Sequence, residues 1–536
     1  MSAAAEAADD TPPGLPRSAA GRHSPFLIAG IVAAGTLMEA LGATALSVAL
    51  PQLSGNLGVS TDEADYVLTI YLVAQAAIMP ISAFAANTFG RKRFYIACII
   101  AFTVASFLCG IAPSLELLIF FRVLQGVAAA GNSASEASII ADSFPPETRG
   151  AGFAIYGLAV VVGPVAGPVL GGLFVDSLDW RWIFFINIPV GILSVAASLY
   201  FLQDSAVLRQ ERAERWRRGI RFDYLGFALA VVGLGALELV LDEGQREDWF
   251  DSGFITFWAV VAGLSLLALP LWELTRKEPV IDFRLLANLN FLACCLVMFV
   301  GFGSLFGSTN LLPLMLQQVF GYNAYWAGLV LTVGGLSTLV LMPASGWLTS
   351  IVPAKWLLVV AFVFSGWGLM LQSGFYEGYG FWQLAAMRGV QTIAFAFLFV
   401  PLQAQAYVGL RPQDNEQASA LLNVVRNLGG SVGVTLATVM VERRGQHHQS
   451  VLAESTDPSN PAWADYLAGL QAGFGNMTDA ADAALAVAYQ SLVTQAQTLA
   501  YNDVYWLFAM ISFASIVLVL LMPAGKPGEG AEAGPG

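Results

Sequence analysis

The chain has 536 residues, of which 57% are hydrophobic and only 12% are charged, whereas soluble domains carry about 25% charged residues. This composition excludes a set of ordinary soluble domains and indicates a membrane protein with many spanning helices. The net charge of −13 argues against a nucleic-acid partner. All four cysteines lie in apolar runs without metal-ligand spacing, so we expect neither a disulfide framework nor a metal site.

Hydropathy over windows of about 19 residues predicts fourteen membrane spans. The apolar runs lie near residues 27–51, 66–86, 94–112, 117–138, 151–175, 182–202, 224–241, 253–272, 290–316, 325–347, 355–374, 381–408, 418–441 and 503–522. They do not alternate apolar and polar residues as the strands of a membrane barrel do. We therefore predict an all-α polytopic membrane protein with fourteen transmembrane helices in the lipid bilayer.

The positive charges predict the orientation of these spans. If the N-terminus is cytoplasmic, eighteen of the 25 lysines and arginines fall in inner segments, four in outer segments and three within spans. Cytoplasmic loops are normally the basic ones, so we predict that both termini are cytoplasmic. Two soluble segments remain, a basic inner linker over residues 204–222 and a long outer loop over residues 443–500. We expect the part of this loop from Asp479 to Ala500 to be helical, because it is rich in Ala and Gln.

The inner loop after the second span combines small residues with a cluster of cations. It reads Ala83-Phe84-Ala85-Ala86-Asn87-Thr88-Phe89-Gly90-Arg91-Lys92-Arg93. Small residues allow helices to approach closely, and Gly90 permits a tight turn before the cations. From the loop alone, a simple anchor on the cytoplasmic side is the favoured interpretation.

The fourth span contains an arginine inside an apolar run, in the sequence Arg122-Val123-Leu124-Gln125-Gly126. A buried arginine in a membrane is costly and needs a partner or a wet cavity. Glu136 lies near the same helix face but about 21 Å farther along the axis, so it is no direct partner. Backbone carbonyls that hold Arg122 for packing alone are the alternative interpretation.

The fifth span has small residues and prolines at a regular spacing, namely Gly163, Pro164, Gly167, Pro168, Gly171 and Gly172. Glycines four residues apart form a flat ridge against which another helix can lie closely. The prolines remove backbone hydrogen bonds and bend the helix. A bent and closely packed helix suits a gated interface, although ordinary helix packing explains the pattern as well.

Several charged and polar residues lie at membrane depth. Glu39 and Glu238 are acids within the first and seventh spans, where loss of solvation disfavours the charged form and allows proton uptake. Further polar residues within spans are Asn310, Asn423, Arg426 and Asn427, and Arg426 precedes a run of small residues. The spans hold three acids and three arginines, a balanced set made of Glu39, Glu136, Glu238, Arg122, Arg388 and Arg426.

The sequence lacks the motifs of the common enzyme classes. Its three histidines lie outside the spans, and it has no phosphate-binding loop, zinc-protease motif or Ser/His/Asp set. We therefore expect no catalytic residues, no ATP-driven transport and no cofactor.

These segments together resemble the signature motifs of the major facilitator superfamily, in the expected order. The loop after the second span is similar to the motif G-x-L-A-D-R-x-G-R-K, and Arg122-x-x-Gln125-Gly126 is similar to the fourth-span motif R-x-x-Q-G. The run from Gly157 to Gly172 resembles the fifth-span antiporter motif. Fourteen spans and the stretch from Trp180 to Pro189 resemble the drug:proton antiporter branch typified by EmrB and QacA, and EmrB in particular.

The resemblance implies a domain organisation and a cellular setting. Six-helix bundles over residues 26–203 and 275–523 would enclose a cavity, with two inserted helices over residues 223–274 and cytoplasmic tails at 1–25 and 524–536. The halves would rock to open the cavity to each side in turn. The resemblance also implies the bacterial inner membrane, an EmrA-like membrane-fusion adaptor and an outer-membrane channel.

Two positions depart from the family pattern. The aspartate of the first-span pattern is Gly42 here, and Glu39 lies three residues earlier on roughly the same helix face. The aspartate of the loop motif is Asn87, which removes a charge that the family uses to hold the outward-open state. Either change can alter coupling or gating.

The sequence therefore predicts export of hydrophobic or amphipathic compounds in exchange for protons. Glu39 is the expected proton carrier, Arg122 is expected to tune it across the cavity, and Glu136 or Glu238 are secondary candidates. Candidate substrate contacts are Tyr71, Gln75, Phe306, Asn310 and Phe397. The alternatives are a dedicated exporter of one metabolite (a fatty acid, siderophore or signalling molecule), a membrane enzyme such as an acyltransferase, and a receptor without transport.

Overall fold

The computed structural model describes residues 24–204, 206–218, 222–276, 279–376, 378–457, 459–474 and 479–522. In these residues the secondary structure consists of helices and turns, without strands. Thirteen of the helices are long and apolar enough to cross a membrane, and α6 (Arg149–Ser177) supplies the remaining span. The predicted all-α, fourteen-span fold is confirmed. The predicted tails at 1–25 and 524–536 lie outside the described residues, apart from Ser24 and Pro25.

The N-terminal half has six spans. They are α1 (Pro25–Thr44) with α2 (Leu46–Leu57), then α3 (Thr61–Phe89), α4 (Arg91–Gly110), α5 (Leu115–Ser143), α6, and α7 (Trp182–Phe185) with α8 (Asn187–Phe201). The first span is divided at Ala45, and Pro51 lies inside α2. Side chains begin two of the long helices, because Ser60 and Glu63 form a capping box at α3 and Ser114 accepts a hydrogen bond from the Leu117 amide at α5.

The C-terminal half repeats the pattern of six spans. They are α12 (Leu289–Gln318), α13 (Ala324–Leu348), α14 (Ala354–Gln372), α15 (Phe381–Ala406), α16 (Asn415–Glu454) and α18 (Ala480–Leu520). The side chains of Asn288 and Asn323 cap α12 and α13 by accepting backbone hydrogen bonds. Short 3₁₀ turns η2 (Phe283–Ala287) and η3 (Pro412–Asp414) precede α12 and α16.

Two inserted spans, α10 (Tyr224–Glu243) and α11 (Gly253–Glu273), lie between the halves in sequence, and η1 (Trp249–Asp251) joins them. The linker before them contains α9 (Ala206–Arg218). Helix α10 packs against α3 of the N-terminal half and also contacts α16 of the C-terminal half. The Ser431 hydroxyl on α16 donates a hydrogen bond to Glu238 at 2.6 Å. The inserted pair is therefore attached to both halves.

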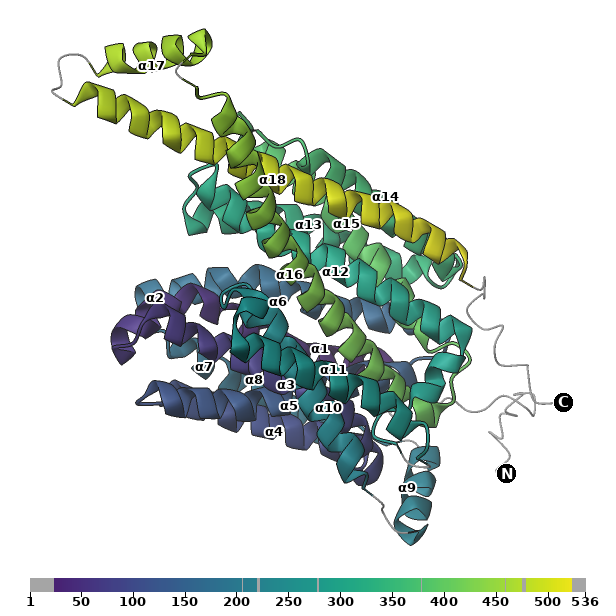
Figure 1. Cartoon of the computed structure of the whole chain (residues 1–536). Helices are drawn as coiled ribbons and strands as arrows, with labels where there is room; N and C mark the ends of the chain where they lie inside the picture. Colours follow the sequence, from purple (N-terminus) through teal and green to yellow (C-terminus); the bar gives the residue numbers. More distant parts are fainter. Residues whose placement is uncertain are drawn as a thin grey trace, which may run out of the picture.

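The segment over residues 443–500 is largely helical, and the helix expected from Asp479 to Ala500 forms the first part of α18. Helix α16 continues to Glu454, α17 (Pro461–Gly473) follows, and α18 begins at Ala480. Figure 1 shows α16, α17 and the first part of α18 projecting beyond the other helices, and we call this projection the outer hairpin. A helix of 40 residues such as α16 is about 60 Å long, roughly twice the thickness of the hydrocarbon core.

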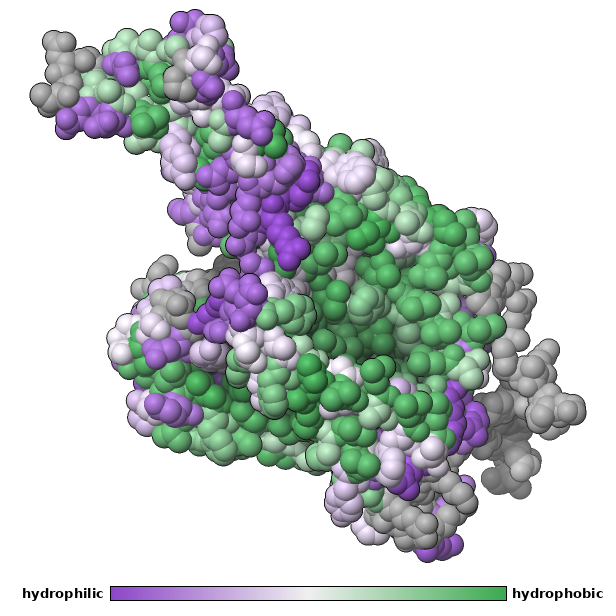
Figure 2. All heavy atoms as spheres, in the orientation of Figure 1, coloured by the Kyte–Doolittle hydropathy of each residue, from purple (hydrophilic) through white to green (hydrophobic). Residues whose placement is uncertain are grey.

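The two ends of the helix bundle differ. Helix α9 and the C-terminal end of α18 lie at one end, which we call the terminal face, and the outer hairpin lies at the other end (Figure 1). Hydrophobic residues cover most of the visible surface of both halves, whereas hydrophilic residues gather at the outer hairpin and near α9 (Figure 2). This distribution fits a membrane that surrounds the middle of the molecule, with polar segments on both sides.

Candidate functional site

A cavity of about 280 Å³ lies between the two halves. Its N-terminal wall includes Glu39, Tyr71, Gln75 and Glu136, and its C-terminal wall includes Phe306, Thr309, Phe395, Arg388 and Arg426. The charges are segregated, since the acids that line it come from the N-terminal half and the arginines from the C-terminal half. The position between two pseudo-equivalent halves is where transporters of this architecture bind their substrates.

The N-terminal wall holds its two carboxylates in defined hydrogen bonds. Glu39 on α1 accepts hydrogen bonds from the Gln75 amide of α3 and from the Ser133 hydroxyl of α5, the latter at 2.6 Å. Glu136 on α5 accepts one from the Thr36 hydroxyl at 2.8 Å. Both acids are buried, and they interact electrostatically with one another. Proton binding at one carboxylate is therefore felt at the other.

Arg426 on α16 is the cation that faces these acids. It interacts electrostatically with both Glu39 and Glu136. The side chain reaches the cavity from the C-terminal half, so the attraction acts between the halves. A change in the charge of either acid therefore alters the electrostatic attraction between the two halves.

Arg122 lies beside Tyr71, outside the lining of this cavity, and contacts neither acid within the described residues. Its guanidinium donates hydrogen bonds to the Val67 carbonyl at 2.9 Å and to the Gln125 side chain at 2.8 Å, and it lies 4.2 Å from the centroid of the Tyr71 ring. It also reaches the carbonyl of Gly42 at 3.5 Å. Tyr71, which lines the cavity, thus separates Arg122 from the acids. The role of Arg122 in tuning Glu39 stays a prediction.

The C-terminal half contains a second copy of this Arg-x-x-Gln arrangement. Arg388 on α15 donates to the side chain of Gln391 at 2.6 Å, as Arg122 donates to Gln125 three residues later. Gln391 then donates to the Ser308 hydroxyl, as Gln125 donates to the Ser106 hydroxyl. From the sequence we identified Arg388 only as a charge within a span, although the spacing from Arg388 to Gln391 equals that from Arg122 to Gln125.

The structure places three of the five candidate substrate contacts at the cavity, namely Tyr71, Gln75 and Phe306. Asn310 is exposed on α12, and Phe397 packs against the hydrophobic core, so neither lines this cavity. Glu238 also lies away from it, at the contact between α10 and α16. The cavity thus brings together Glu39 and Glu136 but leaves out Glu238.

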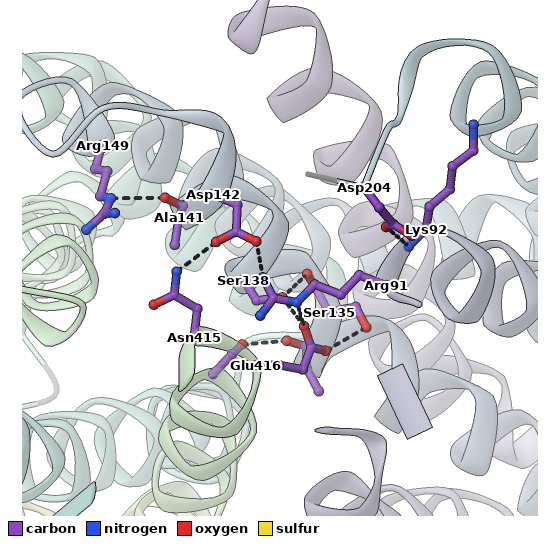
Figure 3. Close-up of polar contacts among 12 residues, drawn as sticks. Arg91, Lys92, Ser135, Ser138, Ala141, Asp142, Arg149, Asp204, Asn415 and Glu416 are labelled. Atoms are coloured by element: carbon purple, nitrogen blue, oxygen red, sulfur yellow. Dashed lines mark hydrogen bonds and ion pairs between the residues drawn. The ribbon is translucent and has the colours of Figure 1, made fainter. Parts of the chain in front are cut away.

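A second polar cluster joins the two halves at the terminal face (Figure 3). Arg91, the first residue of α4, forms an ion pair with Asp142 on α5 and another with Glu416 on α16, the latter at 3.0 Å. Glu416 is completely buried and also accepts hydrogen bonds from Ser135 and Ser138. We call these five residues the terminal latch. Because Glu416 belongs to the C-terminal half, the terminal latch holds the halves together at this face.

Two further contacts join the two halves at the terminal face. The Asn415 amide donates to Asp142 at 2.7 Å, and Arg149 donates to the Tyr407 carbonyl at 3.4 Å. All hydrogen bonds between α5 and α16 in the described residues involve positions from Ser133 to Asp142, which lie toward the terminal face. The structure is therefore a state closed at the terminal face.

The loop motif has a defined geometry around this latch. Gly90 has φ of +96° and ends α3, a backbone conformation that favours glycine. The Lys92 amide donates to Asp204 at 3.0 Å, and its ammonium group donates to the Leu199 carbonyl. The Asn87 side chain is half-buried and forms no hydrogen bond within the described part of the chain.

The glycine ridge of the fifth span packs against the first span. A methyl group at Gly163, Gly167 or Gly171 would collide with Ala40, Thr44 or Ala45 respectively. The predicted close approach of another helix is therefore present, with α1 as the partner of α6. Gly126 makes a similar approach to the Tyr71 carbonyl on α3, and Gly172 is half-buried. The side chains of Pro164 and Pro168 lie outside the described residues.

Sequence reasoning missed several members of the site. Glu416 and Asp142 were not singled out, because an acid beside an inner loop is ordinary in a membrane protein. Ser133 and Thr36, which hydrogen-bond the cavity acids, gave no signal because hydroxyls are common in membrane helices. Asp142 alone could have been suggested from the sequence, because it follows Arg122 and Glu136 on the same helix.

Comparisons with known proteins agree with this architecture. The family model of the Major Facilitator Superfamily matches residues 32–434. The chain is 36% identical to the multidrug export protein EmrB of Haemophilus influenzae over 488 residues, which cover 90% of this chain and 93% of that protein. It is 34% identical to the fatty acid resistance protein FarB of Neisseria gonorrhoeae over 423 residues, covering 78% and 82%.

Among solved structures, the proton:xylose symporter XylE superposes with a TM-score of 0.60 at 14% identity, over 94% of this chain and 97% of that one. At this identity the likeness concerns the fold alone. The family match and the identity to EmrB carry the assignment further. The chain therefore belongs to the major facilitator superfamily, a family of multi-span membrane transporters.

Proposed function

We propose that this protein exports hydrophobic and amphipathic drugs from the cell in exchange for protons. The observation that carries the proposal is the cavity between the halves, where Glu39 and Glu136 face Arg426 beside an otherwise largely apolar wall. Acids at this depth are costly unless they have a function. The relatives named as multidrug export proteins support drugs as the substrate class.

Proton exchange follows from the charges in the cavity. A proton on Glu39 removes its attraction to Arg426, which belongs to the other half. The balance between the state closed at the terminal face and the state open there then shifts, because the two states differ in this interaction. Glu136 is the second candidate for the proton, through its electrostatic interaction with Glu39. No bound cofactor is required, since the proton gradient supplies the energy.

The cellular setting belongs to the same proposal. The terminal face is the cytoplasmic side, on the basis of its arginine-rich linker, and the membrane is the bacterial inner membrane. The described structure is then an outward-facing state. The outer hairpin would stand in the periplasm, where its length suits contact with a membrane-fusion adaptor of the EmrA type and, through it, an outer-membrane channel.

Everted vesicles test the proton exchange. Addition of ethidium to energised vesicles that contain the wild-type protein is expected to release protons, and Glu39→Gln is expected to abolish this release. Glu116→Gln, the same change at an exposed acid in the first turn of α5, is the matched control. Full drug-induced proton release in Glu39→Gln would remove Glu39 from the coupling role.

Export of one endogenous metabolite is the second candidate function. The observation that favours it is the 34% identity to a protein named for fatty acid resistance. Drug susceptibility of a deletion strain discriminates between the two. Sensitivity to many unrelated compounds supports drug export, whereas sensitivity to fatty acids alone supports the dedicated exporter.

A further inference from the structure

The C-terminal wall of the cavity carries an arginine without an acidic partner. Arg388 is only 4% exposed, and its guanidinium donates to two neutral acceptors, Gln391 at 2.6 Å and the Thr309 hydroxyl at 2.6 Å. Its Nε atom has no hydrogen-bond partner. Within the described part of the chain no carboxylate forms an ion pair with it, and Tyr505 is the ionisable group that interacts with it electrostatically. A buried cation of this kind is costly unless an anion compensates it.

Its counterpart in the other half shows that the motif itself does not require an open site. Arg122 lies against the Val67 carbonyl and the Tyr71 ring and does not line the cavity. Arg388 makes the same contact to a glutamine, makes no contact with a ring face or a backbone carbonyl in the described part of the chain, and lines the cavity. Each arginine has one buried nitrogen without a hydrogen-bond partner, Arg122 Nη2 and Arg388 Nε, but only Arg388 faces the site where a substrate would lie.

The unpaired polar atoms of the cavity differ between its two walls. On the N-terminal wall they are the Tyr71 hydroxyl and Glu136 Oε1, whereas on the C-terminal wall they are two donors, Arg388 Nε and Arg426 Nη1. Arg426 already interacts with Glu39 and Glu136, so Arg388 is the one that lacks negative charge. The remaining lining between these groups is mainly apolar, including Val160, Val161, Leu305, Phe306, Leu331 and Phe395.

We propose that Arg388 binds the anionic head of a single-chain amphipathic substrate, whose apolar tail lies among the aromatic and aliphatic residues of the cavity. A carboxylate suits this position, because a planar guanidinium with a free Nε forms charge-assisted hydrogen bonds with it. A cavity of about 280 Å³ is at the low end for small-molecule sites and favours one alkyl chain over a two-chain lipid. The inference rests on the proposed export function and adds an anionic substrate class to it.

Matched probes test this assignment in the full-length protein, purified in a neutral maltoside and placed in phosphatidylcholine nanodiscs. Sodium laurate and dodecyltrimethylammonium have alkyl chains of similar length and opposite head charge. The variants are Arg388→Met, which removes the charge, and Arg388→Lys, which keeps it. Equilibrium binding of each radiolabelled probe is the measurement, and retained binding of the cation shows that a variant is folded.

Arg388→Met is expected to weaken laurate binding by roughly 10- to 100-fold, the effect of one charge-assisted hydrogen-bonded pair. In the same variant, dodecyltrimethylammonium binding is expected to change by less than about 3-fold, which is smaller than the effect of losing one charge-assisted hydrogen bond. Arg388→Lys is expected to retain most of the laurate binding. Laurate binding that is insensitive to Arg388→Met, or equal weakening of both probes, would overturn the assignment.

A transport assay tests the proposed export function separately from the role of Arg388. Proteoliposomes with the wild-type protein are expected to move dodecyltrimethylammonium when a proton gradient is imposed. If they do so while laurate binding ignores Arg388, only the anion assignment fails. If they move neither probe, the proposed function fails, and the binding data still decide the role of Arg388.

Discussion

The terminal latch predicts how easily the two halves separate at the terminal face. Glu416→Gln removes the ion pair between the halves; its amide oxygen can accept from one of the two serines that bond the Glu416 oxygens, and its amide nitrogen can donate to the other hydroxyl. Arg91 keeps Asp142 as its partner, so no uncompensated charge remains. The loss is then that of one charged hydrogen bond, about 1.5–3 kcal/mol. Because only the closed state makes this contact, the ratio of open to closed molecules rises about 10- to 150-fold.

Cysteine accessibility measures this ratio. The four native cysteines are buried, so they can be replaced and a reporter introduced as Ser419→Cys, a buried position on α16. In vesicles that expose the terminal face, a membrane-impermeant maleimide is expected to label the reporter at least about 10-fold faster in Glu416→Gln. Lys92→Gln is the matched control, because the ammonium group of Lys92 donates to the Leu199 carbonyl within its own half.

Two outcomes of the labelling experiment would contradict this prediction. A rate for Glu416→Gln that matches the control variant would mean that the ion pair contributes little to closure. Equal acceleration in the control would instead indicate general loosening of the fold. Either result would refute the role given to the terminal latch.

Three further changes have expected outcomes. Gly167→Ala should lower the thermal unfolding midpoint in detergent, because the added methyl group collides with α1 at a cost of about 1–3 kcal/mol. Gly42→Ala should leave the midpoint unchanged, since the atom nearest to its added methyl group would lie at 3.5 Å. Equal midpoints for the two variants would contradict this prediction. Combined with Glu39→Gln, Gly42→Asp restores the carboxylate of the first-span pattern, and we expect partial recovery of drug-induced proton release; no recovery would argue against a coupling role for that position. Glu238→Val leaves the Ser431 hydroxyl without its acceptor and should cost about 1–3 kcal/mol, measured by thermal denaturation, whereas Glu238→Gln should retain most of the stability.

Hydropathy was sufficient for the membrane spans because a helix in lipid must be apolar over about 20 residues. It could not reveal the division of the first span at Ala45, since the apolar run continues on both sides. The outer hairpin was missed for the opposite reason. Its projecting segments carry many polar residues, which give no hydropathy signal, and only the Ala/Gln-rich part stood out as helical.

The site was predictable where a charge interrupts an apolar run. Glu39, Glu136 and Arg426 were found in this way, and all three line the cavity. Their partners depend on tertiary structure, so the sequence suggested Arg122 as the companion of Glu39, whereas the structure places Arg426 there. The terminal latch was invisible for the same reason, because Arg91 and Glu416 belong to different halves and meet only after both have folded.

Helix α16 connects regions that are far apart. It carries Glu416 at the terminal face, Arg426 at the cavity and the first part of the outer hairpin at its far end. Such a continuous helix acts as a stiff lever, so a tilt of about 10° around the terminal face moves a tip about 60 Å away by roughly 10 Å. Under the proposed function, a tilt of α16 that follows a change of charge in the cavity would therefore move the outer hairpin, because Arg426 and the hairpin are parts of the same helix.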